Sequence, residues 1–305
     1  MDTKLFVNKQ SGGMFSVVDK QHYTGTIFYV DASNADASDS AGYGANPDIP
    51  YATLDYAIGK TTASVGDVIF LMPGHTENIA SATGALMDVA GVRVIGLGSG
   101  ALVPTLSLIT AAGATLSITA ASCSVENIKL VSNYTGGATA GITLAATAGG
   151  CVLDGIVFTE TANTKEFLIG ITIAADCDDV IIQNCQYNGI AGGTTSSIVS
   201  AAGGTDRSII RDNYFHGDAS AAALKFDAAA SSDLQILRNI VINIDTAAGL
   251  GIACHNSGTG FMVGNQVANL KDTVVGLSGT GMAYCENYAS NALGASGIIL
   301  PAVDS

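Results

Sequence analysis

The residues of this sequence best suited to acid–base chemistry are three aspartates set close together, Asp176, Asp178 and Asp179. Two carboxyl groups facing one bond can serve as general acid and general base, as they do in glycoside hydrolysis. The three residues fall between two apolar runs, however, and aspartate is also a common turn residue. We therefore interpret the cluster as a turn, and Asp178 and Asp179 serve as catalytic carboxylates only in an alternative, enzymatic interpretation.

Basic residues beside carboxylates are the second feature that could do chemistry. Arg211 and Arg238 stand shortly before two asparagines, Asp212 and Asp233 are close by, and Lys225 lies between the two arginines. An arginine or lysine could abstract a proton in an elimination reaction. Arginine next to aspartate on a surface is more often an ion pair that contributes ~0–1 kcal/mol. Arg211 thus joins the alternative interpretation, and the main interpretation assigns no catalytic residue.

Metal ligation has little support in the sequence. The loop that holds Asp31, Asp36, Asp39 and Asp48 lacks the ligand order, central glycine and terminal glutamate of an EF-hand loop. The histidines are far apart, and no CxxC pair exists among the cysteines. We therefore expect no metal site, no cofactor and reduced, buried thiols at the six cysteine positions: Cys123, Cys151, Cys177, Cys185, Cys254 and Cys285.

Composition and charge exclude several classes of protein. The 305 residues include 12 Lys and Arg against 26 Asp and Glu, which gives a net charge of −14. Nucleic-acid binding requires clustered basic residues, so we expect neither nucleic acid nor an anionic membrane as a partner. The chain has no apolar stretch long enough to span a bilayer. Its first residues do not read as a signal peptide, so we expect synthesis in the cytoplasm.

The elements that must position these residues follow a repeat. Short apolar runs alternate with small turn residues, and the aligned turn residues recur at spacings of 22 to 31 residues from Gly96 to Asn287. Asparagine and glycine tolerate the left-handed backbone of a sharp corner, and stacked asparagines can form a hydrogen-bonded ladder. The pattern predicts a ladder of six asparagines: Asn127, Asn184, Asn213, Asn239, Asn265 and Asn287.

Units of this length with about three strands each bury a core only by stacking. Over about residues 65–295 the chain resembles the pectate-lyase-like superfamily, which implies an all-β, right-handed parallel β-helix. A helix within YATLDYAIGK would belong to a cap over the open end of the solenoid. The expected divisions are an N-terminal arm (1–22), a cap (23–64), the β-helix (65–296) and a C-terminal tail (297–305).

Pectin hydrolases of this fold carry an adjacent Asp pair together with Gly-His-Gly and Arg-x-Lys motifs. Here His216 lies in Phe-His-Gly-Asp, and no Arg-x-Lys is present. The segments NKQSGG, GTIFYVD and GDVIFLMPGHTENI resemble β-helix proteins encoded among the structural proteins of tailed bacteriophages. This resemblance implies a non-enzymatic virion protein, either a capsid decoration protein or a spike.

The same resemblance implies partners and a location. Residues 1–22 would attach the chain to a capsid or tail protein, the chain would assemble with itself as a homotrimer, and a host surface glycan is a further candidate partner. The alternative is a polysaccharide lyase or hydrolase of the tailspike depolymerase type.

Overall fold

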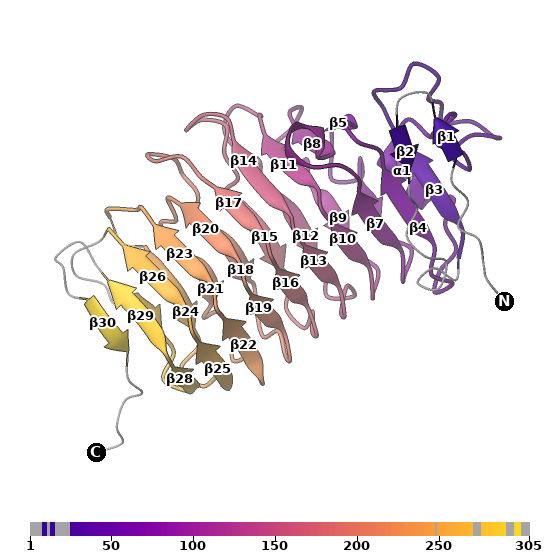
Figure 1. Ribbon diagram of the computed structural model, residues 1–305. Helices are drawn as coiled ribbons and strands as arrows, with labels where there is room; N and C mark the ends of the chain where they lie inside the picture. The colour runs from indigo at the N-terminus through magenta and orange to yellow at the C-terminus, as the bar shows by residue number, and fades with distance from the viewer. Residues whose placement is uncertain are drawn as a thin grey trace.

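The computed structural model describes residues 8–10, 13–15, 25–247, 249–270, 276–290 and 296–299. It confirms the expected fold class, an all-β parallel β-helix, in which the chain passes repeatedly through three sheets (Figure 1). The first sheet has ten strands: β3 (Ile27–Val30), β4 (Val68–Leu71), β7 (Arg93–Gly96), β10 (Ser124–Glu126), β13 (Val152–Asp154), β16 (Ile181–Gln183), β19 (Ile209–Arg211), β22 (Leu234–Leu237), β25 (Gly260–Val263) and β28 (Met282–Cys285).

The other two sheets complete each coil. The second sheet contains β5 (Thr76–Ile79), β8 (Thr105–Leu108), β11 (Lys129–Ser132), β14 (Val157–Glu160), β17 (Gln186–Asn188), β20 (Tyr214–Gly217), β23 (Ile240–Asn243), β26 (Gln266–Asn269), β29 (Asn287–Ser290) and β30 (Ser296–Ile299). The third sheet contains β6 (Leu86–Met87), β9 (Leu116–Ile118), β12 (Ile142–Leu144), β15 (Ile169–Ile173), β18 (Ser197–Ala201), β21 (Ala222–Phe226), β24 (Leu250–Cys254) and β27 (Leu277–Ser278).

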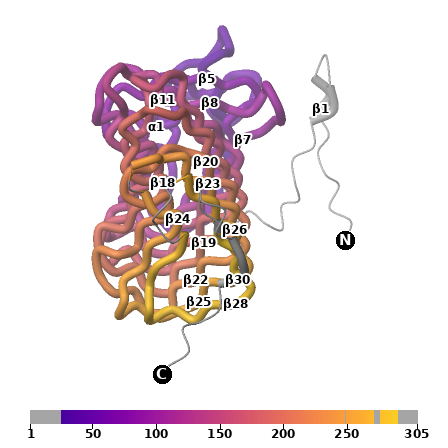
Figure 2. Tube along the Cα trace, turned by 90° about the vertical axis from the view of Figure 1, so that its left-hand side faces the viewer, coloured from indigo at the N-terminus to yellow at the C-terminus, as the bar shows by residue number. Residues whose placement is uncertain are grey.

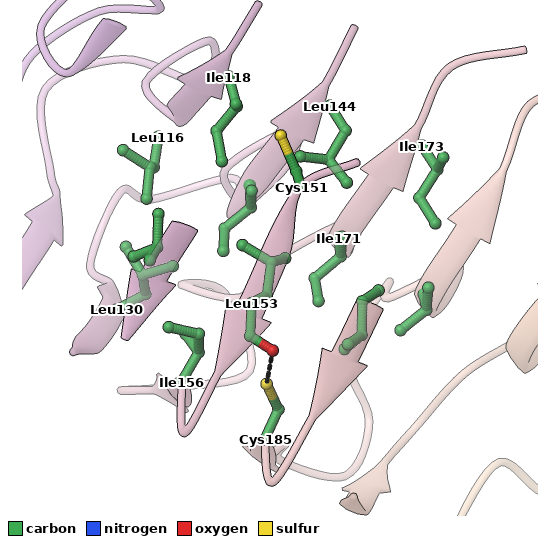
Figure 3. Packing of buried hydrophobic residues seen from close by; sticks show 14 of the residues in the cluster. Leu116, Ile118, Leu130, Leu144, Cys151, Leu153, Ile156, Ile171, Ile173 and Cys185 are labelled. Carbon is green, nitrogen blue, oxygen red and sulfur yellow. Dashed lines mark hydrogen bonds between the residues drawn. The ribbon is translucent and has the colours of Figure 1, made fainter. Parts of the chain in front are cut away.

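Strands of successive coils pair in parallel and in register, so equivalent residues form columns along the stack (Figure 2). Alternation then decides which columns face inward. In the second sheet Leu130, Phe158, Tyr187 and Phe215 stand in one inward column, and all four are fully buried. Figure 3 shows the same interlocking of aliphatic side chains from several coils around Leu153. One continuous core therefore runs through the solenoid.

The corner between the first and second sheets holds the asparagine ladder. Asn213, Asn239, Asn265 and Asn287 are buried, and each side-chain amide donates to Oδ1 of the next asparagine at 2.9, 3.0 and 2.9 Å in turn. Each of these amides also donates to a backbone carbonyl, for example Asn239 Nδ2 to Ile210 O at 2.8 Å. Both amide protons of Asn213, Asn239 and Asn265 are thus satisfied, and Asn287 donates to Met262 O.

Two residues predicted for this ladder lie one position too early. Asn127 and Asn184 occupy the left-handed corner itself, with φ of 52° and 54°, and the residues that follow them point inward instead. Those inward residues are Ile128 and Cys185, which continue the ladder column with apolar side chains. The physical reason is that asparagine fits either place, because it tolerates positive φ and also forms the ladder.

A cap closes the N-terminal end of the solenoid. Strand β3 pairs with β4 and extends the first sheet, while helix α1 (Leu54–Ile58) buries Leu54, Ala57 and Ile58. Asp39, from the candidate calcium loop, accepts hydrogen bonds from the Ala52 and Thr53 backbone at 2.9 and 3.1 Å. This carboxylate holds the chain in front of the helix, where it complements the positive end of the helix dipole.

Some short elements are not part of the parallel coils or of the cap. Strands β1 (Asn8–Gln10) and β2 (Gly13–Phe15) form an antiparallel hairpin, a 3₁₀ turn spans Gly100–Leu102, and β30 pairs antiparallel with β29. Most of the predicted arm (1–22) and tail (297–305) lies outside the described residues. Within the described part, no helix is both long and apolar enough to cross a membrane.

Candidate functional site

The three residues of the alternative, enzymatic interpretation are not assembled into one site. They are Asp178, Asp179 and Arg211. Asp179 receives two hydrogen bonds from Arg207, at 2.7 and 2.8 Å, and Asp178 Oδ1 accepts the Asp206 backbone N–H at 2.8 Å. Arg211 lies on β19, where its guanidinium donates instead to Gln183 Oε1. The two aspartates are thus turn residues of the coil corner, and Arg211 belongs to the outer face of the first sheet.

The bonds to arginine set the ionisation of these exposed carboxylates. The hydrogen bond from Arg207 lowers the pKa of Asp179, and that from Arg238 lowers the pKa of Asp212. Arg238 binds both oxygens of Asp212 at 2.7 and 2.8 Å. An arginine held between two carboxylate oxygens is a poor general base, so these pairs stabilise corners of the coil.

The outer face of the third sheet carries a different arrangement. Register places one residue of each strand in a single row across β9 to β27, and every member except the buried Ala253 is partly exposed. Five of the seven residues in this row present a hydroxyl group, and we call it the hydroxyl row: Ser117, Thr143, Thr172, Ser200, Lys225, Ala253 and Ser278. The part of the row before Lys225 is uncharged.

Side chains capable of acid–base chemistry lie at this row and beside it. Lys225 Nζ is 2.6 Å from Asp227 Oδ1, and the two side chains are 29% and 41% exposed. Because Phe226 pairs with Cys254, Asp227 and His255 are neighbours at the ends of adjacent strands. The backbone N–H of His255 donates to Phe226 O at 3.0 Å, so the backbone pairing between β21 and β24 extends to this residue. Lys225 and Asp227 are therefore in contact, and His255 occupies the neighbouring position on the next coil.

The tautomer of His255 follows from its local hydrogen bond. The Ser257 backbone N–H donates to His255 Nδ1 at 3.1 Å. A neutral imidazole that accepts at Nδ1 carries its proton on Nε2. In its neutral form, His255 thus keeps Nε2–H as a hydrogen-bond donor.

The sequence contains a signal for the arrangement of Lys225, Asp227 and His255. Leu224 and Phe226 alternate inward, which places Lys225 and Asp227 on one outer face. His255 follows Asp227 by 28 residues, close to the length of one coil. Titratable residues that are far apart in a solenoid sequence can therefore occupy neighbouring positions on successive coils.

Two buried glutamates also stand out, but they hold a loop. Glu160 accepts hydrogen bonds from the Tyr187 hydroxyl at 2.5 Å and the Ile190 backbone at 2.8 Å, and Glu166 accepts from the Thr194 backbone at 2.7 Å. Burial raises the pKa of Glu160. Both side chains are at most 5% exposed, so they anchor residues 190–194 and do not face a substrate.

Metal ligands are not gathered in the described part of the chain, where no three His, Cys, Asp or Glu side chains are arranged to hold an ion.

Comparison with known proteins finds no matching family model and no match among curated proteins. Among solved structures, the chain is similar to pectin methylesterase from Aspergillus niger, with 14% identity, a TM-score of 0.49, and coverage of 95% of this chain and 88% of that chain. It is also similar to a rhamnogalacturonan lyase, with 12% identity, a TM-score of 0.38 and 90% coverage of each chain.

These neighbours correct one prediction. Both are enzymes, so the expectation that the chain is not an enzyme is contradicted. At such identities the likeness concerns the fold, and fold alone does not define a reaction. The substrate and the reacting residues have to be argued from this chain's own side chains.

Proposed function

We propose that the chain is a polysaccharide-cleaving enzyme, a lyase or hydrolase, whose reacting groups are Asp227 and His255 with Lys225 as their charged neighbour. The observation that supports this most is the contact between the Lys225 ammonium and the Asp227 carboxylate, with the imidazole of His255 at the neighbouring position of the next coil. Acid–base cleavage needs one group that accepts a proton and one that donates it.

The hydroxyl row supports a polymeric substrate. Neighbouring strands lie about 4.8 Å apart, so the row from Ser117 to Ser278 is roughly 29 Å long. A linear sugar chain lying along it would meet a serine or threonine at most strands, and hydroxyl groups both donate and accept hydrogen bonds. The uncharged stretch before Lys225 favours a neutral polysaccharide over a polyanion, in keeping with the net charge of −14.

The proposed roles follow from the positions of the protons. In its imidazolium form, His255 gives its Nε2 proton to the oxygen of the bond that breaks and is left as a neutral imidazole, while Asp227 takes a proton from the attacking water. This step is hydrolysis; elimination would instead need Asp227 to remove the acidic carbon-bound proton of a uronic acid, which a neutral polysaccharide lacks. Lys225, 2.6 Å from Asp227, balances the carboxylate charge and orients it.

Incubation with neutral and acidic polysaccharides tests this function. We expect release of reducing ends from at least one substrate, and ultraviolet absorbance of the products tells elimination from hydrolysis. His255→Gln keeps a polar side chain without a titrating ring and should reduce the rate by about 100-fold or more. Asp212→Asn, at the corner that follows β19, is the control and should retain activity. Activity that survives His255→Gln would refute the assignment.

We also propose that the enzyme acts from the surface of a tailed-phage particle, as a homotrimer attached through residues 1–22. The resemblance of residues 6–80 to phage β-helix proteins supports this location. Purified virions should contain the full-length chain and should lose a variant that lacks residues 1–20. Sedimentation of the intact protein as a monomer at high concentration would refute the trimer.

A further inference from the structure

Two buried cysteines lie side by side on consecutive coils. Cys123 and Cys151 immediately precede β10 and β13, whose residues Ser124 and Val152 are paired in register. The Val152 backbone N–H donates to Cys123 O at 2.9 Å, so the pairing continues through the cysteines. Adjacent strands are about 4.8 Å apart, which falls within the roughly 4.4–6.8 Å between Cα atoms that a disulfide spans.

The two thiols interact. Cys123 Sγ lies 3.3 Å from Val89 O, and Cys151 Sγ lies 3.5 Å from Ala120 O, so both point toward the turn that precedes the first sheet. The contact with the Cys151 thiol lowers the pKa of Cys123 to about 7, and the same contact raises the pKa of Cys151. Cys123 is therefore the more readily ionised thiol, with Cys151 beside it.

The other cysteines do not share this alignment. On the next coil, Ile181 pairs with Val152, so Val180 takes the place that Cys151 has, and Cys177 lies three residues earlier. Cys285 is exposed on the outer face of the first sheet. Cys123 and Cys151 are the aligned pair within the described residues.

We propose that Cys123 and Cys151 are a redox modification site, at which a peroxide oxidant produces a disulfide between consecutive coils. The Cys123 thiol loses its proton, the thiolate attacks hydrogen peroxide, the O–O bond breaks, and a sulfenic acid and hydroxide form; the hydroxide takes up the released proton to give water. The Cys151 sulfur then attacks the sulfenic sulfur and gives up its proton, a second water leaves, and the S–S bond forms. Two thiols are oxidised and one peroxide is reduced. The reaction is separate from the proposed polysaccharide cleavage.

Mass spectrometry on a Cys285→Ser background tests the site without interference from the exposed thiol. The folded protein is treated with hydrogen peroxide, unfolded, alkylated and digested. We expect a peptide pair joined through Cys123 and Cys151, with Cys177 alkylated. The joined protein should also have a higher thermal midpoint, which returns to its original value with a thiol reductant.

A second variant keeps the proposal falsifiable. With Cys151→Ser added, the proposed partner is missing, so Cys123 should accumulate as a sulfenic acid that dimedone traps. A disulfide between Cys151 and Cys177, or full alkylation of both Cys123 and Cys151 after peroxide treatment, would overturn the proposal. Absence of a dimedone adduct on Cys123 in the Cys151→Ser variant would overturn the role of Cys123 as the attacking thiol.

Discussion

Replacing Asn239 with leucine removes the central member of the asparagine ladder. Asn239 is fully buried, and its Oδ1 accepts from both the backbone N–H and the side-chain amide of Asn213, at 3.2 and 2.9 Å. Its own amide donates to Ile210 O and Asn265 Oδ1, at 2.8 and 3.0 Å. The substitution therefore deletes four hydrogen bonds inside the core.

The cost follows from which groups remain unpaired. Asn265 Oδ1 keeps the Asn239 backbone N–H, and Asn213 Nδ2 keeps Ile182 O, so these atoms retain one bond each. The Asn213 backbone N–H and one of its amide protons lose their acceptor. A buried unsatisfied donor costs about 1–3 kcal/mol. Two of them, offset in part by the apolar leucine, give an expected loss of about 3 kcal/mol in the free energy of unfolding.

Urea unfolding followed by circular dichroism measures this loss. A matched control is Asn188→Leu, because Asn188 lies on the outer face of β17 and bonds only to Gln186 among the described contacts. The control should change the free energy of unfolding by less than about 0.5 kcal/mol, as surface substitutions do. Equal midpoints for Asn239→Leu and Asn188→Leu would refute the role of the ladder in stability.

Three further predictions concern other sites. Cys185→Asn should extend the ladder by one member and raise the free energy of unfolding by about 1 kcal/mol, and a lower thermal midpoint would contradict this. Because burial raises the pKa of Glu160, this group favours folding below its unfolded pKa and loses that contribution as pH rises through its folded pKa. The urea midpoint of the native protein should therefore fall relative to that of Glu160→Gln as pH rises above the ordinary glutamate pKa of about 4.3, and parallel pH profiles would contradict it. Arg207→Ala breaks an exposed ion pair with Asp179 and should leave both the urea midpoint and the activity close to those of the native protein, which urea unfolding and reducing-end release check.

The fold could be predicted from the sequence because the repeat is visible in short apolar runs and in the turn residues between them. Apolar runs of strand length and a recurring corner residue specify a stack of coils, whatever the individual side chains do. The ladder was predictable only in part. Asn213, Asn239, Asn265 and Asn287 each follow a residue that holds the left-handed corner, whereas Asn127 and Asn184 hold that corner themselves. An alignment on asparagine alone does not separate the two cases.

The candidate site required more than local pattern. Asp178 and Asp179 are adjacent in sequence and attracted the catalytic interpretation, yet they serve a turn. Asp227 and His255 are 28 residues apart and become neighbours only through the register between β21 and β24. Coil lengths in this chain vary, so register could not be read from the spacing alone.

The most direct measurement of the proposed function is the ratio of initial cleavage rates for Asp227→Asn and Asp178→Asn on the polysaccharide that the native protein degrades fastest. Both changes replace one carboxylate with an amide of the same size. We predict a rate for Asp178→Asn close to that of the native protein and a rate for Asp227→Asn lower by about 100-fold or more. Equal rates for the two variants would contradict the assignment of the reaction to the outer face of the third sheet.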